Sequence, residues 1–156
     1  MTWENCSTST ARNSMIASEA FFVDSNILVY AVDRSDAAKH ASAKKFIMEQ
    51  ENNALACMSI QNLVEFHFAA TNRIEKPIPL NESLQIIAEL KSIFSVKRYH
   101  SKTVIAAIRL QQLYGVHFWD ALIAATMQEN HIQIIYTENE KDFKKIPGIN
   151  VINPLK

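Results

Sequence analysis

Short, mostly apolar runs alternate with longer stretches of mixed polarity along the chain. The runs have the length of buried β-strands, and they are AFFV (20–23), ALACM (54–58), SVKRY (95–99), IQIIY (132–136) and INVI (149–152). The longer stretches between them carry apolar residues at helical spacing. The pattern therefore predicts an α/β fold, a three-layer structure in which about five parallel strands are sandwiched between helices.

Capping residues and chain breakers indicate where the predicted helices begin and end. The expected helices cover residues 37–51, 59–71, 82–94, 101–114 and 120–130. Ser59, Asn81 and Ser101 are the predicted N-caps, because a side-chain oxygen at this position accepts a hydrogen bond from a free backbone N–H. Gly115 suits the left-handed residue that follows a helix.

The first twenty residues differ in composition from the rest of the chain. They are rich in Ser, Thr and Asn and lack the apolar core of a secretory signal. We expect residues 1–19 to form a disordered leader and residues 20–156 to form a single domain, with the functional chain starting at Met1 or at Met15. No apolar run is long enough to span a membrane.

The overall composition excludes several functional classes. Sixteen basic residues balance sixteen acidic ones, so no overall field draws the protein to a polyanion. The two glycines rule out the glycine-rich phosphate loops of proteins with a nucleotide cofactor. The two cysteines, Cys6 and Cys57, lack metal-ligand spacing and favour a reducing cytoplasm.

Asp24 interrupts the apolar sequence FFVDSNILVYA at the end of the first predicted strand. Because burying an unpaired carboxylate costs roughly several kcal/mol, this position predicts a compensating partner. In a parallel sheet Asp24 would lie at the carboxyl edge, where open α/β folds place their ligand sites. A turn in which Asp24 or Ser25 caps the following helix explains the same residues equally well.

Further acidic residues are expected at the same edge of the sheet. Glu65 lies in the helix after the second strand, and Asp120 heads the last long helix. The segment TENEKDF, after the fourth strand, adds Glu138, Glu140 and Asp142. Taken singly, each acid has a structural explanation as part of a solvated helix face, a helix cap or a charged loop.

Taken together, four strand–helix junctions deliver carboxylates to one edge of one sheet. Like charges repel and raise each other's pKa unless a cation lies between them. Oxygen ligands without pairs of Cys or His select a hard ion such as Mg²⁺ or Mn²⁺. The sequence therefore predicts a divalent metal site, with the metal as the partner of Asp24.

Four motifs, in this order, resemble those of the PIN-domain nucleases and, more narrowly, of the VapC-like toxins of toxin–antitoxin systems. They are FVDSNILVYA, NLVEF, FWDALIAA and YTENEKDF, and the resemblance covers residues 20–155. It implies a parallel sheet between helices and an endoribonuclease that hydrolyses RNA with a divalent metal. By position, Asp24, Glu65 and Asp120 would be the metal-site carboxylates, and Asn26 would hold Asp24 in place.

The resemblance also implies an antitoxin partner and a homodimer. The predicted helices 59–71 and 82–94 carry more apolar residues than one face of a sheet requires, which agrees with a helical surface available for association.

The fourth motif departs from the family pattern. Many relatives carry an aspartate where this chain has Asn139, and a neutral amide binds a metal ion more weakly. This departure favours an alternative, a catalytically weak or inactive PIN-fold module that binds RNA or protein without cutting. For the fourth acid we expect Asp142 rather than Glu138, because alternation along the strand turns Glu138 away from the other acids, whereas Thr137 offers a hydroxyl.

Contact with an RNA backbone would have to come from local basic patches, since the net charge is zero. Two clusters are weak candidates, and they consist of Lys97, Arg98 and Lys102, and of Lys141, Lys144 and Lys145. An ordinary solvated surface explains each cluster equally well.

Overall fold

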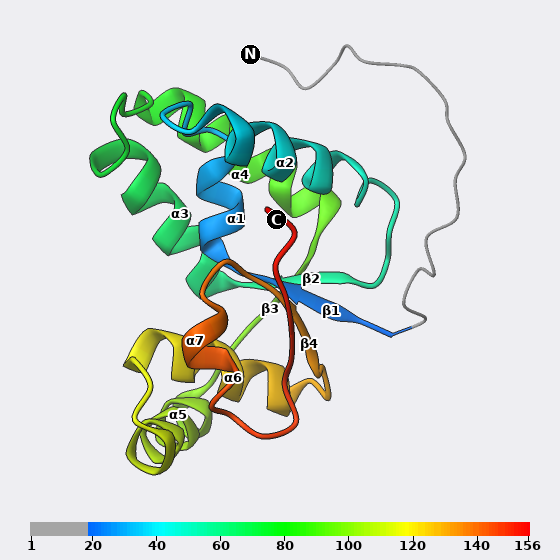
Figure 1. The fold of residues 1–156 in the computed structure, drawn as a ribbon, viewed down its shortest axis with the longest axis vertical. Helices are drawn as coiled ribbons and strands as arrows, with labels where there is room; N and C mark the ends of the chain where they lie inside the picture. Colours follow the sequence, from blue (N-terminus) through cyan, green and yellow to red (C-terminus); the bar gives the residue numbers. More distant parts are fainter. Residues whose placement is uncertain (1–18) are drawn as a thin grey trace.

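The computed structural model describes residues 19–156 (Figure 1). Its elements in chain order are β1 (Phe21–Val23), α1 (Ser25–Tyr30), α2 (Ala37–Met48), β2 (Ala56–Ser59), α3 (Ile60–Asn72), α4 (Leu80–Ile93), β3 (Ser95–Lys97), α5 (Ser101–Tyr114), α6 (Phe118–Glu129), β4 (Ile134–Tyr136), α7 (Glu140–Phe143) and β5 (Asn150–Ile152). The predicted leader, residues 1–19, lies outside the described residues except for its last position, so its disorder stays a prediction.

Within the described residues, the strands form one five-stranded parallel sheet in the order β3-β2-β1-β4-β5. This confirms the predicted α/β fold. The chain adds β2 and β3 on one side of β1 and then crosses to the other side for β4 and β5. Open α/β sheets bind ligands beyond the carboxyl ends of their strands, at the point where the strand order reverses. In this chain that point lies between the ends of β1 and β4.

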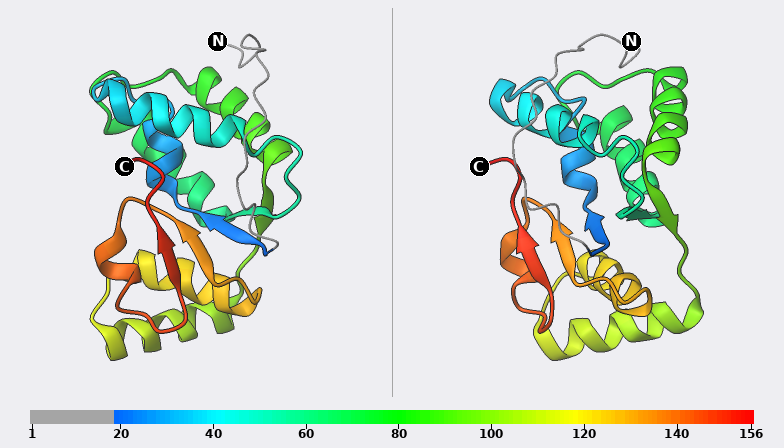
Figure 2. Two further views of the ribbon diagram at one scale, coloured as in Figure 1. Left: turned by 45° about the vertical axis from the view of Figure 1, so that its right-hand side comes forward. Right: turned by 90° about the vertical axis from the view of Figure 1, so that its right-hand side faces the viewer.

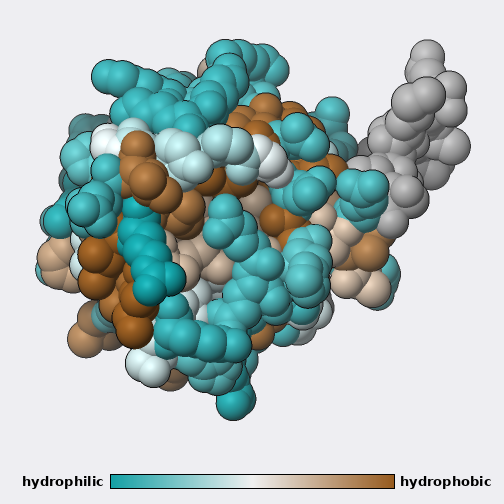
Figure 3. All heavy atoms as spheres, turned by 90° about the horizontal axis from the view of Figure 1, so that it is seen from below, coloured by the Kyte–Doolittle hydropathy of each residue, from teal (hydrophilic) through white to brown (hydrophobic). Residues whose placement is uncertain are grey.

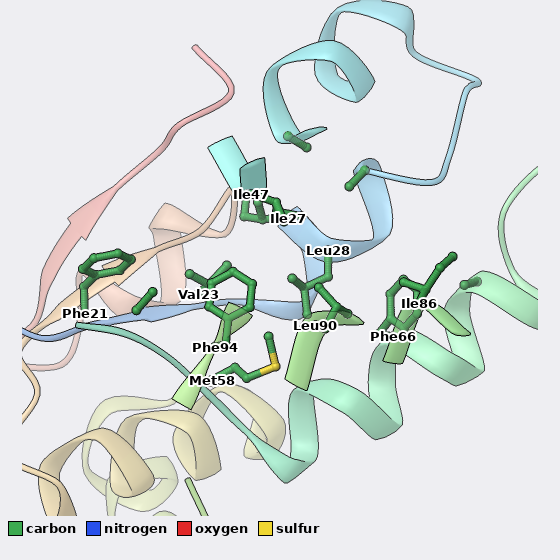
Figure 4. Close-up of a cluster of buried hydrophobic side chains, with 14 residues drawn as sticks. Phe21, Val23, Ile27, Leu28, Ile47, Met58, Phe66, Ile86, Leu90 and Phe94 are labelled. Carbon is green, nitrogen blue, oxygen red and sulfur yellow. The ribbon is translucent and has the colours of Figure 1, made fainter. Parts of the chain in front are cut away.

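The central strand β1 divides the hydrophobic core, because successive side chains of a strand point to opposite faces. Phe21 and Val23 pack among residues of α1, α2, α3 and α4 (Figure 4). Phe22 faces the other way and packs with Ile123 of α6. Figures 1 and 2 show helices on both sides of the sheet, with α1 to α4 on one side and α5 and α6 on the other. Both layers hold β1 in place, and this fixes the position of Asp24 directly after it.

Two of the four predicted helix signals are confirmed, and two are wrong. Ser59 caps α3 through a capping box with Asn62. Gly115 follows α5 in the left-handed conformation, with a φ of 61°. Asn81, in contrast, lies inside the first turn of α4, because the helix already begins after Pro79. Proline suits this boundary since its fixed φ is compatible with the start of a helix.

The starts of α5 and α6 also differ from the prediction. Ser101 is the first residue of α5 and not its cap, and the preceding residue is His100. The N–H of His100 donates instead to the hydroxyl of Thr103, at 2.9 Å. The helix α6 begins at Phe118, so Asp120 lies in its first turn. An acidic residue there still interacts favourably with the helix dipole, although it does not cap the helix.

Large apolar side chains remain exposed on several helices. They include Val64 and Phe68 of α3, Leu80 and Leu84 of α4, and Leu113 of α5. Figure 3 views the molecule from the side on which α5 lies, and its hydrophobic side chains form separate brown patches among hydrophilic ones. None of the helices in residues 19–156 is long and apolar enough to cross a membrane.

Candidate active site

Asp24 lies at the carboxyl end of the central strand, and its side chain is 4% exposed. Its Oδ1 accepts a hydrogen bond from the backbone N–H of Ser25 at 2.7 Å, as the N-cap of α1. Its Oδ2 accepts from Asn26 Nδ2 at 2.8 Å and from the hydroxyl of Thr137 at 2.6 Å. Donors of the chain itself therefore offset part of the cost of burying Asp24. The helix-cap and site interpretations describe the same side chain.

The segment after β4 connects Asp24 to Asp120. Thr137 donates its hydroxyl to Asp24 and accepts the backbone N–H of Asn139 at 2.9 Å. The side-chain amide of Asn139 donates to Asp120 Oδ2 at 2.8 Å. Two residues that follow one strand thus hold two carboxylates, from the end of β1 and from the first turn of α6.

Glu65 belongs to the same hydrogen-bonded region, although it lies on α3. Its Oε2 accepts the hydroxyl of Ser25 at 2.6 Å, and its Oε1 accepts from Gln61 Nε2 at 2.8 Å. Gln61 also donates to the backbone carbonyl of Trp119 at 2.9 Å. Because Gln61 is buried, Glu65 is not part of a solvated polar stripe. It is held toward the ends of β1 and α6.

The two candidates for the fourth acid point in different directions. Asp142, in the short helix α7, is 8% exposed, and its negative charge helps to raise the pKa of Asp120, so the two carboxylates lie close together. Glu138 accepts the Tyr30 hydroxyl at 2.5 Å and pairs with Lys39, both outside the group of acids. The structure thus places Asp142, and not Glu138, beside the other carboxylates.

Burial and mutual repulsion perturb the pKa values of these acids. Burial raises the pKa of Asp24 to about 6, and the negative charge of Glu65 adds to this effect. Burial also raises the pKa of Asp120 to about 7, and the negative charges of Asp24 and Asp142 add to this effect. The pKa of Asp142 is instead lowered, chiefly by its hydrogen bond with Lys145. Ionised at neutral pH, Asp24 and Asp120 would create excess negative charge that a bound cation relieves.

The donor set fits a hard divalent cation in its chemistry but does not form a closed cage. Within residues 19–156, no group of three or more His, Cys, Asp or Glu side chains converges closely enough to hold a metal ion. Asp24 is electrostatically coupled to Glu65 and to Asp120, and Asp120 to Asp142. These side chains offer only oxygen ligands, the type that Mg²⁺ and Mn²⁺ prefer. Asp24, Glu65, Asp120 and Asp142 are therefore the residues available for a metal.

The two basic clusters lie at different distances from these acids. Lys144 and Lys145, which follow α7, form ion pairs with Glu140 and Asp142 of that helix. Lys102, from the other cluster, pairs with Glu129 at 2.8 Å. Glu129 and Asp120 stand near opposite ends of α6, about 14 Å apart at the rise of an α-helix. The cluster around Lys102 therefore lies away from the acidic site.

Sequence reasoning did not identify Ser25, Gln61 or Trp119 as parts of this site. Gln61 had a signal, because its position four residues before Glu65 places both on one face of a helix. Ser25 directly follows Asp24, and Trp119 directly precedes Asp120. Their contacts, however, join segments that are far apart in the chain.

The protein thus belongs to the α/β class and has an open parallel sheet. Its carboxylates gather where the strand order reverses and form an acidic, oxygen-rich site. The family model for the PIN domain matches residues 21–149. The chain therefore belongs to the PIN domain family, which confirms the resemblance noted in its sequence. No curated protein sequence matches the chain.

Solved structures of toxins and toxin–antitoxin complexes share this fold. A toxin-antitoxin complex from Klebsiella pneumoniae is 24% identical, with a TM-score of 0.63, and the match covers 87% of this chain and 98% of that one. DNA-bound VapBC from Salmonella typhimurium is 19% identical with a TM-score of 0.65, over 87% and 98%. VapC20 of Mycobacterium tuberculosis, described as a Sarcin-Ricin loop cleaving toxin, is 19% identical with a TM-score of 0.63, over 78% and 92%.

Proposed function

We propose that this chain is a metal-dependent endoribonuclease and the toxin of a toxin–antitoxin pair. The observation that carries the proposal is the pair of buried or half-buried carboxylates, Asp24 and Asp120, held by Thr137 and Asn139 where the strand order reverses. Family membership and the toxins among its structural relatives support the same function.

Mg²⁺ or Mn²⁺ is the cofactor that the donor set favours, held by Asp24, Glu65 and Asp120 with Asp142 as the fourth acid. When bound, such an ion supplies Lewis-acid chemistry that activates water and offsets negative charge on a phosphodiester. The chain orients each ligand separately. Asn26 and Thr137 hold Asp24, Ser25 and Gln61 hold Glu65, and Asn139 holds Asp120.

Asn139 has a positioning role in this proposal. Its amide donates to Asp120, so a neutral side chain at this position orients a carboxylate and adds no further charge. The fourth negative charge comes from Asp142, which lies one helical turn further along the chain. The departure from the family pattern is therefore compatible with catalysis.

The second candidate function is a PIN-fold module that binds RNA or protein without cutting it. Two observations favour it, the neutral Asn139 and the ion pair at 2.8 Å between Asp142 and Lys145. Both reduce the negative charge available to a metal.

Cleavage of labelled RNA by the purified full chain separates these functions. We expect cleavage with Mg²⁺ or Mn²⁺, none with a chelator, and none with Asp24→Asn or Asp120→Asn in the presence of metal. Glu51→Gln, which changes an exposed residue after α2, is the matched control and should cleave like the wild type. RNA binding without cleavage by the wild-type protein would support the second function, and full activity of either aspartate variant would refute the site.

The proposed partners of the chain are an antitoxin and a second copy of itself. Val64 and Phe68 on α3 and Leu80 and Leu84 on α4 are exposed, and such apolar surface is typical of association. We expect a homodimer by light scattering at micromolar concentration, and toxicity on expression that a cognate antitoxin relieves. A monomer at that concentration would contradict the homodimer.

A further inference from the structure

We propose that the indole of Trp119 stacks on the nucleobase next to the phosphate that is cut. This inference rests on the proposed function, because it names how the same site binds its RNA. Trp119 is 59% exposed, although residues 121–127 of the same helix are all buried. A large aromatic side chain thus remains in solvent at the end of α6 that carries the acid.

The position of Trp119 is fixed relative to two of the candidate metal ligands. Asp120 is the next residue in the chain, so the two α-carbons are about 3.8 Å apart. The carbonyl of Trp119 accepts from Gln61 Nε2 at 2.9 Å, and the same amide donates to Glu65 at 2.8 Å. The ring also packs edge-to-face against Phe118, with centroids 5.5 Å apart. The backbone of Trp119 is therefore anchored beside the acids before any RNA binds, and its exposed indole lies at the same end of α6.

The charge distribution of the protein leaves a need for uncharged contacts with RNA. The net charge is zero, and two of the three lysines in or directly after α7, Lys144 and Lys145, already pair with carboxylates. Phosphate contacts alone would give weak binding under these conditions. Stacking of a base on an aromatic side chain does not depend on charge and tolerates every base. Trp119 supplies such a contact within reach of a phosphate at the acids.

A second copy of the chain is the other occupant that this surface suggests, because Ile60 and Val64 of α3 are also exposed. Covering Trp119 with protein would further dehydrate Asp120 and Glu65, which already lie in a crowded acidic region. Removing charged carboxylates from water is costly unless a cation or a donor replaces the water. A nucleobase whose phosphate reaches the acids together with a bound cation meets this condition, so it fits the position better.

Fluorescence of Trp119 tests the inference without requiring cleavage. The sequence contains one other tryptophan, Trp3, so Trp3→Phe in the full chain makes Trp119 the single reporter. Adding Asp24→Asn keeps the RNA intact, and Mg²⁺ stays in the buffer so that the remaining acids do not repel the phosphate. We expect a labelled single-stranded RNA of mixed sequence to quench the emission in a saturable manner. Trp119→Ala should weaken binding about 5- to 100-fold, the effect typical of losing one stacked base, and Trp119→Phe should restore most of it.

Abasic RNA gives the sharper test. A single abasic site is moved along the oligonucleotide, one position at a time. At one position it should weaken binding to the protein that keeps Trp119 by the same factor as Trp119→Ala does with intact RNA. At that position it should not weaken binding to the Trp119→Ala protein any further. Leu113→Ala, on α5, removes an apolar side chain that is even more exposed than Trp119 and should bind like the wild type. Unchanged affinity with Trp119→Ala, or unchanged emission of the Trp119 reporter when RNA is added, would overturn the inference. If that variant also becomes monomeric, the surface is an interface between copies instead.

The outcomes separate this inference from the proposed function. Quenching, with the matching loss on abasic RNA, supports stacking even if the wild-type protein never cleaves. Cleavage by the wild type, with the same KM for Trp119→Ala and no sensitivity to abasic sites, would confirm the nuclease and refute the stacking.

Discussion

Replacing Asp120 by asparagine should stabilise the metal-free protein while abolishing RNA cleavage. The pKa of Asp120 is raised from its ordinary value of 3.8 to about 7, chiefly by burial and then by Asp24 and Asp142. A difference of this size corresponds to about 4 kcal/mol for a fully shielded group. Because Asp120 is only half-buried, solvent screening reduces the penalty to roughly 1–2 kcal/mol. Asparagine keeps an oxygen that can accept from Asn139 and carries no charge.

The size of this effect depends on pH. Above about pH 7, Asp120 is ionised in both the folded and the unfolded chain, and the folded wild type bears the full penalty. As the pH falls from about 7 toward 4, the folded protein takes up a proton before the unfolded chain does, so the wild type gains stability. We therefore expect Asp120→Asn to raise Tm by about 2–8 °C at about pH 8, with a smaller difference near pH 4.

Thermal unfolding followed by circular dichroism measures this difference, with chelator and then with Mg²⁺. Metal that binds only the folded wild type should raise its Tm and leave Asp120→Asn unchanged, which reverses the order of the two proteins. Glu51→Gln, at an exposed position, should show no pH-dependent difference. An Asp120→Asn protein that melts at or below the wild-type temperature in chelator at about pH 8 would refute the electrostatic argument.

Three other substitutions test separate parts of the structure. Asp142→Ala should lower cleavage at limiting Mg²⁺ more than Glu138→Ala does, because Asp142 lies close to Asp120. Excess Mn²⁺ should partly restore the cleavage by Asp142→Ala. A metal titration with the reverse ranking would assign the role of the fourth acid to Glu138. Gln61→Leu removes the buried donor to Glu65 and should cost about 1–3 kcal/mol in urea unfolding together with most of the activity, whereas unchanged activity would show that Glu65 needs no such support. Gly115→Ala introduces a side chain at a φ of 61° with nothing within 4 Å, so it should lower the free energy of unfolding by about 1 kcal/mol, with Gly115→Asn less affected.

The sequence predicts the sheet well because buried parallel strands require continuous apolar runs. The runs ending at Val23 and Tyr136 became the neighbouring strands β1 and β4, and this placed Asp24 and Thr137 together. Acids that directly follow a strand or begin a helix are therefore predictable in position. The direction of Glu138 was predictable too, since neighbouring residues of an extended chain point to opposite sides.

Contacts between distant segments could not be predicted in the same way. Ser25 donates to Glu65 across forty residues of chain, and nothing in either local sequence indicates this bond. The hydroxyl of Thr137, which follows the neighbouring strand β4, is one of the donors to Asp24, and the local sequence does not show that β1 and β4 are neighbours. Helix starts were misplaced where another residue supplied the boundary, as Pro79 did for α4.

The segment after β4 is set by its length as much as by its side chains. Thr137 and Asn139 turn toward Asp24 and Asp120, while Glu138 between them turns toward Tyr30 and Lys39. Inserting or deleting one residue here would exchange the two sides and point both supports away from the carboxylates. Natural variants and engineered libraries should therefore tolerate changes in the chemistry of residue 138 more readily than any change in the spacing between the end of β4 and α7.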